Sequence, residues 1–165
     1  MARRKKSLVS VLMPFALSIA LSACAGTTPE HGKTKDFVGE ITHVQLLDDY
    51  QHFDANYQSF EVTDEQASLL GALPADTKID VYFATWCHDS VREVPRLLKA
   101  MATRPDIELN LLALDYKKQD PNGLAEKAGV KFTPTIVVSK NGKELGRIIE
   151  RPEKGFVEDI AGFVK

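Results

Sequence analysis

The sequence predicts an α/β fold in which a central mixed sheet has helices on both faces, and three observations support this prediction. The chain has 165 residues, 44% apolar and 27% charged, which suits one globular domain and excludes a disordered or polytopic membrane protein. From residue 78 onward, apolar β-branched runs alternate with segments of helical periodicity in the order βαβαββα. Asn141 and Gly142 separate two of these runs, and Asn-Gly in that position is typical of a β-hairpin.

The first 23 residues have the layout of a secretory signal peptide. Residues 3–6 are basic, residues 8–20 are apolar, and small residues precede Cys24. The 13 apolar residues rise only about 20 Å as a helix, short of a hydrocarbon core of roughly 30 Å, so we expect no permanent membrane span. Cleavage removes four basic residues and no acidic one, so the formal net charge falls from −2 to −6. An acidic mature chain argues against a nucleic-acid partner.

Residues 21–24, Leu-Ser-Ala-Cys, resemble the lipobox of bacterial lipoproteins. The resemblance implies that the chain is cut before Cys24 and that the thiol of this residue carries lipid. Ala25 stands where such proteins carry Asp for inner-membrane retention, so we expect an outer-membrane anchor facing the periplasm. The alternative is an ordinary secretory peptide with an incidental cysteine. Residues 24–36 lack apolar periodicity and are predicted to form a lipidated tether in which His31 is solvated.

Residues 37–73 are predicted to be an N-terminal, largely helical extension packed on the domain. Residues 41–47 favour a short strand or turn, and three aromatic residues, Tyr50, Phe53 and Tyr57, then recur at helical spacing. Their stripe is expected to pack in the core, with a substrate groove as the alternative. A second helix begins after Thr63, whose hydroxyl is expected to reach the amide of Gln66 in a capping box.

Residues 74–165 are predicted to form the main domain. The expected helix after the first strand has apolar residues on one face, at 91, 94, 98 and 101, and mostly charged residues on the other. Gly129 is expected to end the short helix that follows the second strand. In order, the expected elements are a strand at 78–85, the helix just described, a strand at 107–114, a helix at 121–128, strands at 135–139 and 144–149, and a helix at 153–164.

Cys87 lies where the first of these strands meets the helix, and it is the one cysteine left after Cys24. Free amides and the positive end of the helix dipole favour a thiolate there. A protonated His88 acts in the same direction, while Asp89 opposes it. The alternatives are a buried, inert cysteine and a histidine that is merely solvated.

Several spaced motifs resemble the thioredoxin superfamily over residues 74–165. They are residues 83–90 with Trp86 and Cys87, a proline eight residues after the cysteine, residues 132–135 and residues 140–143. The resemblance implies a three-layer α/β/α sandwich in which Trp86 shields a nucleophilic Cys87. It also implies a cis bond between Thr133 and Pro134, in a loop that faces the cysteine and binds extended peptide.

The sequence departs from the family pattern at two positions. Ser90 replaces the second cysteine, so the chain cannot form the intramolecular disulfide of a dithiol cycle. The buried acid of the family falls on Val81, and its neighbour Asp80 is expected to point to the opposite face of the sheet.

These features predict a monothiol thiol-disulfide oxidoreductase or isomerase of the cell envelope. Cys87 would form mixed disulfides with protein thiols, and an external thiol or reductase would resolve them. Trp86, His88 and Ser90 are expected to complete the catalytic site. In a variant of this redox function, peroxide would oxidise the Cys87 thiol to a sulfenic acid, which an outside thiol would resolve. The main alternative is a redox-inactive module that binds peptide through Trp86 and Pro134.

We expect no cofactor and no metal. Adjacent Cys87 and His88 are weak evidence for copper or zinc without a second pair of ligands, and His43 and His52 show no ligand spacing. A glutaredoxin-like iron–sulfur site is disfavoured, because Trp86 precedes the cysteine in the thioredoxin manner and the protein is expected to be exported.

Overall fold

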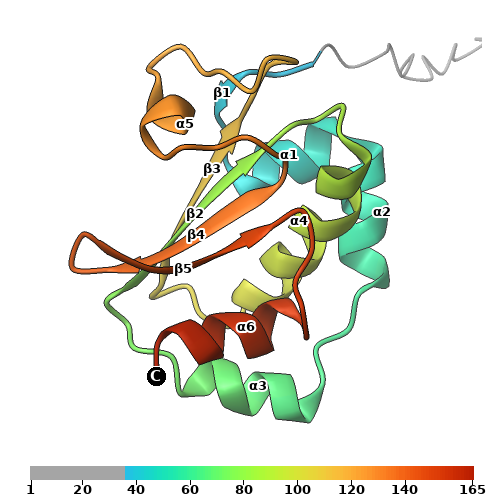
Figure 1. The fold of residues 1–165 in the computed structure, drawn as a ribbon. Coiled ribbons are helices and arrows are strands. Elements are labelled where there is room, and N and C mark those ends of the chain that lie inside the picture. The colour runs from blue at the N-terminus through green and yellow to red at the C-terminus, as the bar shows by residue number, and fades with distance from the viewer. Residues whose placement is uncertain (1–35) are drawn as a thin grey trace, which may run out of the picture. The chain divides into compact units, whose positions relative to one another are not determined.

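The computed structural model describes residues 36–165 (Figure 1). The predicted signal peptide, Cys24 and His31 lie outside these residues. In chain order, the elements are β1 (Gly39–Glu40), α1 (His43–Asp49), α2 (Gln51–Ser59), α3 (Asp64–Gly71), β2 (Thr77–Phe83), α4 (His88–Met101), β3 (Glu108–Ala113), α5 (Leu124–Lys127), β4 (Thr135–Lys140), β5 (Lys143–Ile149) and α6 (Phe156–Phe163). Among the described residues, no helix combines the length and the apolar character that crossing a bilayer requires.

The five strands form one mixed sheet in the order β1-β3-β2-β4-β5. Strands β2 and β3 are parallel, and the other neighbouring pairs are antiparallel. The hairpin between β4 and β5 turns at Asn141 and Gly142, which both have positive φ values, of 52° and 76°. The predicted mixed α/β architecture and its Asn-Gly hairpin are therefore confirmed.

The two faces of the sheet bury different helices. Ile79, Val81 and Phe83 of β2 belong to the main core, together with residues from α1, α2, α3, α4 and α6. Tyr82, on the opposite face, packs in a smaller cluster with residues of β3 and α5. Alternate residues of β2 thus serve two hydrophobic clusters, as the two-residue period of a strand requires.

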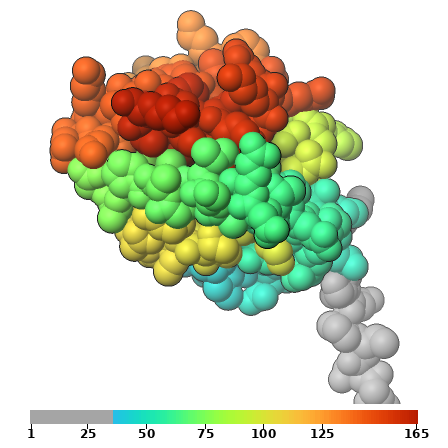
Figure 2. All heavy atoms as spheres, turned by 90° about the horizontal axis from the view of Figure 1, so that it is seen from below, coloured from blue at the N-terminus to red at the C-terminus, as the bar shows by residue number. Residues whose placement is uncertain are grey.

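The segment 37–73 contributes a strand to the sheet and three helices to the main core. Phe53 of α2 is buried and packs edge-on against Phe83 of β2, with ring centroids 5.9 Å apart. Helix α3 lies beside α6 (green and red in Figure 2), where the side-chain amide of Gln66 donates to Glu158 at 3.1 Å. The predicted capping box of α3 is confirmed, because Thr63 accepts from the amide of Gln66.

The expected strand or turn at 41–47 is wrong, since residues 43–49 form α1 and the strand lies two residues earlier. Thr42 and Gln45 make a complete capping box, which satisfies free amides at the helix start. The apolar residues of this short segment fit the periodicity of a strand and that of a helix. The capping pair favours the helix. Buried Leu46 then faces the core.

Two other helices are shorter than expected. Helix α5 begins at Leu124 rather than 121, because Gly123 adopts φ +66° and the carboxylate of Asp120 accepts from the amides of Asn122 and Ala125. Helix α6 begins at Phe156 rather than 153. There the carboxylate of Asp159 accepts from the amide of Glu153 at 2.7 Å and holds the preceding turn outside the helix.

Candidate functional site

Cys87 is the N-cap residue of α4, directly after the end of β2. Its backbone is extended, with φ −85° and ψ 122°, and its carbonyl accepts the first helical hydrogen bond from Val91 at 2.9 Å. The thiol is half-buried and is not in a disulfide. Its Sγ atom donates to the carbonyl oxygen of Thr133 at 3.1 Å. The cysteine thus lies at a helix N-terminus, in contact with a loop 46 residues away in sequence.

The loop that contacts Cys87 contains the predicted cis peptide bond between Thr133 and Pro134, which is confirmed. Both residues are buried. The carbonyl of Pro134 accepts from the amide of Glu150 at 2.7 Å, which ties the loop to the end of β5. Strands β2 and β4 are antiparallel neighbours, so the end of one and the start of the other meet at the same edge of the sheet.

Ser90 lies one helical turn beyond Cys87 and is fully buried. Its Oγ atom accepts from the amide of Ala84 at 3.2 Å, which links the first turn of α4 to the end of β2. The hydroxyl therefore has a structural partner and does not face solvent.

His88 and Asp89 occupy the first turn of α4. His88 is exposed. Asp89 forms ion pairs with Arg92, on the next turn, and with Arg151 after β5, the latter at 3.3 Å. The hydrogen bond from Arg92 lowers the pKa of Asp89 below its ordinary value of 3.8. The acid is therefore ionised at neutral pH and is neutralised locally by two guanidinium groups.

Trp86 stacks on a residue that the sequence analysis did not single out, Tyr116. The two ring centroids are 4.5 Å apart and the planes differ by 15°. The hydroxyl of Tyr116 donates to the carboxylate of Asp36 at 2.6 Å, and this hydrogen bond raises the pKa of Tyr116. The ammonium group of Lys118 lies 5.2 Å from the centroid of the indole.

Tyr116 and Lys118 follow β3, which is parallel to β2. The carboxyl ends of parallel neighbours meet at one edge of a sheet, so residues after 113 lie close to residues after 83. The parallel pairing of β2 and β3 is therefore the feature that would have predicted Tyr116 near Trp86. No local sequence motif marks this tyrosine.

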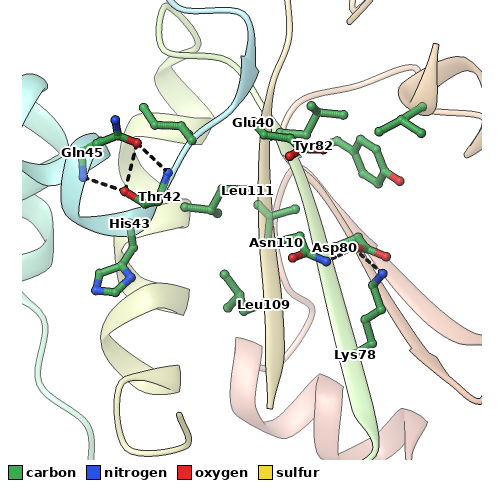
Figure 3. A pocket seen from close by; sticks show the side chains of 14 residues that line it. Glu40, Thr42, His43, Gln45, Lys78, Asp80, Tyr82, Leu109, Asn110 and Leu111 are labelled. Carbon is green, nitrogen blue, oxygen red and sulfur yellow. Dashed lines mark hydrogen bonds and ion pairs between the residues drawn. The ribbon is translucent and has the colours of Figure 1, made fainter. Parts of the chain in front are cut away.

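Asp80 and Val81 lie on opposite faces of β2, as expected from their one-residue offset. Val81 is buried in the main core. Asp80 accepts from Asn110 at 2.9 Å and pairs with Lys78 at 3.5 Å. These side chains line a pocket of about 840 Å³ between the start of α1 and strands β2 and β3 (Figure 3). None of the predicted site residues lines this pocket.

The other histidines of the described chain are separate from the cysteine. His43 lines the pocket from the start of α1, on the side away from Asp80 (Figure 3), and His52 is exposed on α2. Within residues 36–165, no group of three or more His, Cys, Asp or Glu side chains is arranged to hold a metal ion.

A strand that leads into a helix-capping thiol, opposite a cis-proline loop on a mixed sheet, defines a thioredoxin-fold protein. The thioredoxin family model matches residues 36–160. A thioredoxin from Echinococcus granulosus is 38% identical over 80 residues, 48% of this chain and 70% of that protein. The chain therefore belongs to the thioredoxin family, a family of thiol-disulfide oxidoreductases.

Solved structures show the same fold. A protein of unknown function from Pseudomonas aeruginosa matches with a TM-score of 0.56 and 16% identity, over 69% of this chain and 82% of its own. An HIV epitope scaffold matches with a TM-score of 0.56 and 17% identity over the same shares. The family match begins at residue 36, so it includes the segment 37–73 that the sequence analysis treated as an extension.

Proposed function

We propose that this protein is a thiol-disulfide oxidoreductase of the cell envelope that works through one nucleophile, Cys87. The observation that carries the proposal is the position of its Sγ atom, at the N-terminus of α4 and 3.1 Å from the carbonyl of Thr133. Helix N-termini stabilise a thiolate through unpaired amides and the helix dipole. The half-buried thiol remains open to a disulfide on its solvent side.

The reaction begins when the Cys87 thiolate attacks one sulfur of a substrate disulfide. A bond forms between that sulfur and Sγ, the substrate disulfide breaks, and the other substrate sulfur leaves with the electron pair as a thiolate. In the next step, a thiolate from the substrate or from a small thiol attacks the substrate sulfur of the mixed disulfide. Cys87 leaves as a thiolate, and the disulfide is carried away on the substrate.

Ser90 determines which thiol completes the cycle. A serine oxygen cannot replace a sulfur in a disulfide, and this one is buried and bonded to Ala84. The resolving thiol therefore comes from outside the chain. When it comes from the same substrate, the reaction is disulfide isomerisation without net electron transfer. Reduction needs an external thiolate to attack Sγ of Cys87 instead, so that the substrate leaves as a dithiol. A second external thiolate then frees Cys87, and the two external thiols leave joined as their disulfide.

Trapping mixed disulfides tests this proposal. Cells expressing the full chain are quenched with acid, alkylated, and compared with cells expressing Cys87→Ser. We expect disulfide-linked adducts with envelope proteins in the wild type that reductant releases, and none in the variant. His52→Gln is a matched control, because this exposed histidine lies on α2 and its replacement should keep the adducts. If no adducts form while partners still co-purify non-covalently, a peptide-binding module explains the protein better.

We also propose that the domain is held at the outer membrane by lipid on Cys24. The support is the lipobox-like segment at residues 21–24 and the absence of Asp at position 25. Radiolabelled palmitate should label the wild type and Cys87→Ser but not Cys24→Ser. Ala25→Asp should shift the labelled protein to the inner-membrane fraction. Label on Cys24→Ser would contradict lipidation at this residue, and an unchanged fractionation of Ala25→Asp would contradict the sorting argument.

A further inference from the structure

The loop after β3 is a tightly bonded turn that faces Trp86. The carboxylate of Asp115 accepts from the amides of Lys117 and Gln119, both at 2.8 Å, and the amide of Asp115 donates to the carbonyl of Gln119 at 3.0 Å. Lys118 has a φ of +61°, in the left-handed region that residues other than glycine rarely adopt. A strained residue held by several hydrogen bonds is a feature of functional loops.

This turn directs two side chains at the tryptophan that precedes the nucleophile. Tyr116 stacks on the indole of Trp86, and its hydroxyl is fixed by Asp36. Lys118 is half-buried, with its ammonium group over the same indole. No carboxylate within residues 36–165 forms an ion pair with Lys118, whereas Lys78 and Lys140 both have such partners. Among the described residues, the loop therefore holds a cation without an ion-pair partner over Trp86, the residue that precedes Cys87.

We propose that Lys118 determines substrate specificity by selecting disulfides that carry a carboxylate close to the reacting sulfur. This inference rests on the proposed function of Cys87. Two unit charges about 4 Å apart in water attract by about 1 kcal/mol, which is about a fivefold preference, and the effect weakens with salt. The acid within the loop, Asp115, accepts from two backbone amides, and Asp36 accepts from the hydroxyl of Tyr116; neither carboxylate forms an ion pair with Lys118. Tyr116 is a positioning residue, because it holds the indole under the cation.

The test is a single-turnover reaction of the reduced full chain with two chromogenic disulfides. Dithiobis(nitrobenzoate) carries a carboxylate on each ring, and dithiodipyridine has none. In each case the Cys87 thiolate bonds to one sulfur and releases the other half as a coloured thiolate or thione, so the rate is measured directly. A Cys24→Ser background leaves Cys87 as the one reactive thiol, since the sequence contains two cysteines.

Lys118→Met and Lys118→Gly remove the cation, and glycine also suits the positive φ of this position. We expect both to slow the reaction with the anionic disulfide by about fivefold and to leave the rate with dithiodipyridine within about twofold. Lys118→Glu should slow the anionic reaction further, and added salt should reduce all three differences. Lys117→Met is the matched control, because this neighbouring lysine is exposed, and it should leave both rates unchanged.

The outcomes separate the specificity inference from the proposed function. If the wild type reacts with neither disulfide faster than a free thiol does, the proposed function fails and the inference fails with it. If Cys87 reacts rapidly but the ratio of the two rates is unaffected by Lys118, the specificity inference alone is overturned. An equal loss with both reagents, or an equal effect of Lys117→Met, also overturns it, since either result indicates a structural or general surface effect.

Discussion

The Sγ atom of Cys87 and the carbonyl oxygen of Thr133 lie 3.1 Å apart, although 46 residues separate them in sequence. Their contact follows from the antiparallel pairing of β2 with β4, which brings the end of the first strand to the start of the second. The thiol is therefore positioned by the sheet as well as by the helix it caps. We propose that a substrate peptide pairs with the backbone at Thr133, which would bring its sulfur close to Cys87.

Trp86 is the one tryptophan of the chain, so its fluorescence reports on the stack with Tyr116. Tyr116→Leu removes the ring, and we expect a red-shifted emission, stronger quenching by iodide and a loss of about 0.5–1.5 kcal/mol in stability. Tyr116→Phe keeps the ring and removes only the hydrogen bond to Asp36, so its emission should stay close to that of the wild type. Identical spectra for the wild type and Tyr116→Leu would show that the stack does not persist in solution.

Asp89 should make stability depend on pH in the acidic range. Its pKa is lowered by the hydrogen bond from Arg92, so its contribution is fully present above the ordinary value of 3.8 and is lost as the pH falls through the folded-state pKa. We expect Asp89→Asn to reduce the free energy of unfolding by about 0.5–1 kcal/mol at pH 7, because the pair is partly exposed.

Urea unfolding of both proteins at neutral pH and well below pH 3.8 measures this difference. It should shrink as the pH falls, since the protonated aspartic acid no longer pairs with Arg92. Arg151→Met should have a smaller effect at pH 7 than Asp89→Asn, because Arg151 is more exposed and lies 3.3 Å from the carboxylate. A difference that is constant with pH would contradict the assignment to the ion pair.

The centre of the fold could be predicted from the sequence because local signals there agree with one another. The apolar run of β2, the amphipathic stripe of α4 and the Asn141-Gly142 turn each specify one structure. The segment 41–47 could not be assigned from periodicity, since a short apolar run fits a strand and a helix equally well. The pair Thr42 and Gln45 carried the missing information, in the same spacing that correctly identified α3.

The site could be predicted only where residues follow one another or match a spaced motif. Cys87 and Ser90 come from one such motif, and Thr133 with Pro134 from another. Tyr116 and Lys118 join the site through the parallel pairing of β2 and β3 and through a turn with a positive φ. Such contacts depend on strand order and on backbone conformation, which the composition of the loop does not encode.

Phe53 should be essential for stability, because it joins the segment 37–73 to the sheet. It is 1% exposed and packs against Phe83 and Tyr50, with ring centroids 5.9 Å and 6.1 Å away. We expect Phe53→Ala to lower the free energy of unfolding by about 3–5 kcal/mol in a single cooperative urea transition. Phe132→Ala is the control, since this ring is 50% exposed, and it should cost about 0.5 kcal/mol or less. Two separate transitions would mean that the segment folds independently of the sheet.

Replacing Ser90 with cysteine tests whether the missing sulfur is all that prevents a dithiol cycle. Residues three apart on a helix lie on the same face, close enough for a disulfide. We expect Ser90→Cys to form a disulfide with Cys87 and to reduce a disulfide substrate catalytically when reductant is supplied, whereas the wild type stops at a mixed disulfide or needs excess small thiol. The serine also accepts a hydrogen bond from the amide of Ala84, so the variant loses some stability.

Ser90→Ala separates the loss of the hydrogen bond to Ala84 from the gain of a second sulfur. It should lower the free energy of unfolding by about 1–3 kcal/mol, because the buried amide of Ala84 loses its partner, and it should not gain turnover. Mass measurement after alkylation shows whether the engineered disulfide forms, and a coupled reduction assay measures turnover. A disulfide that forms without turnover would show that another group is missing, and Val81 is the leading candidate, since it fills the position where the family carries a buried acid. In that case the peptide-binding role would explain the site better than catalysis.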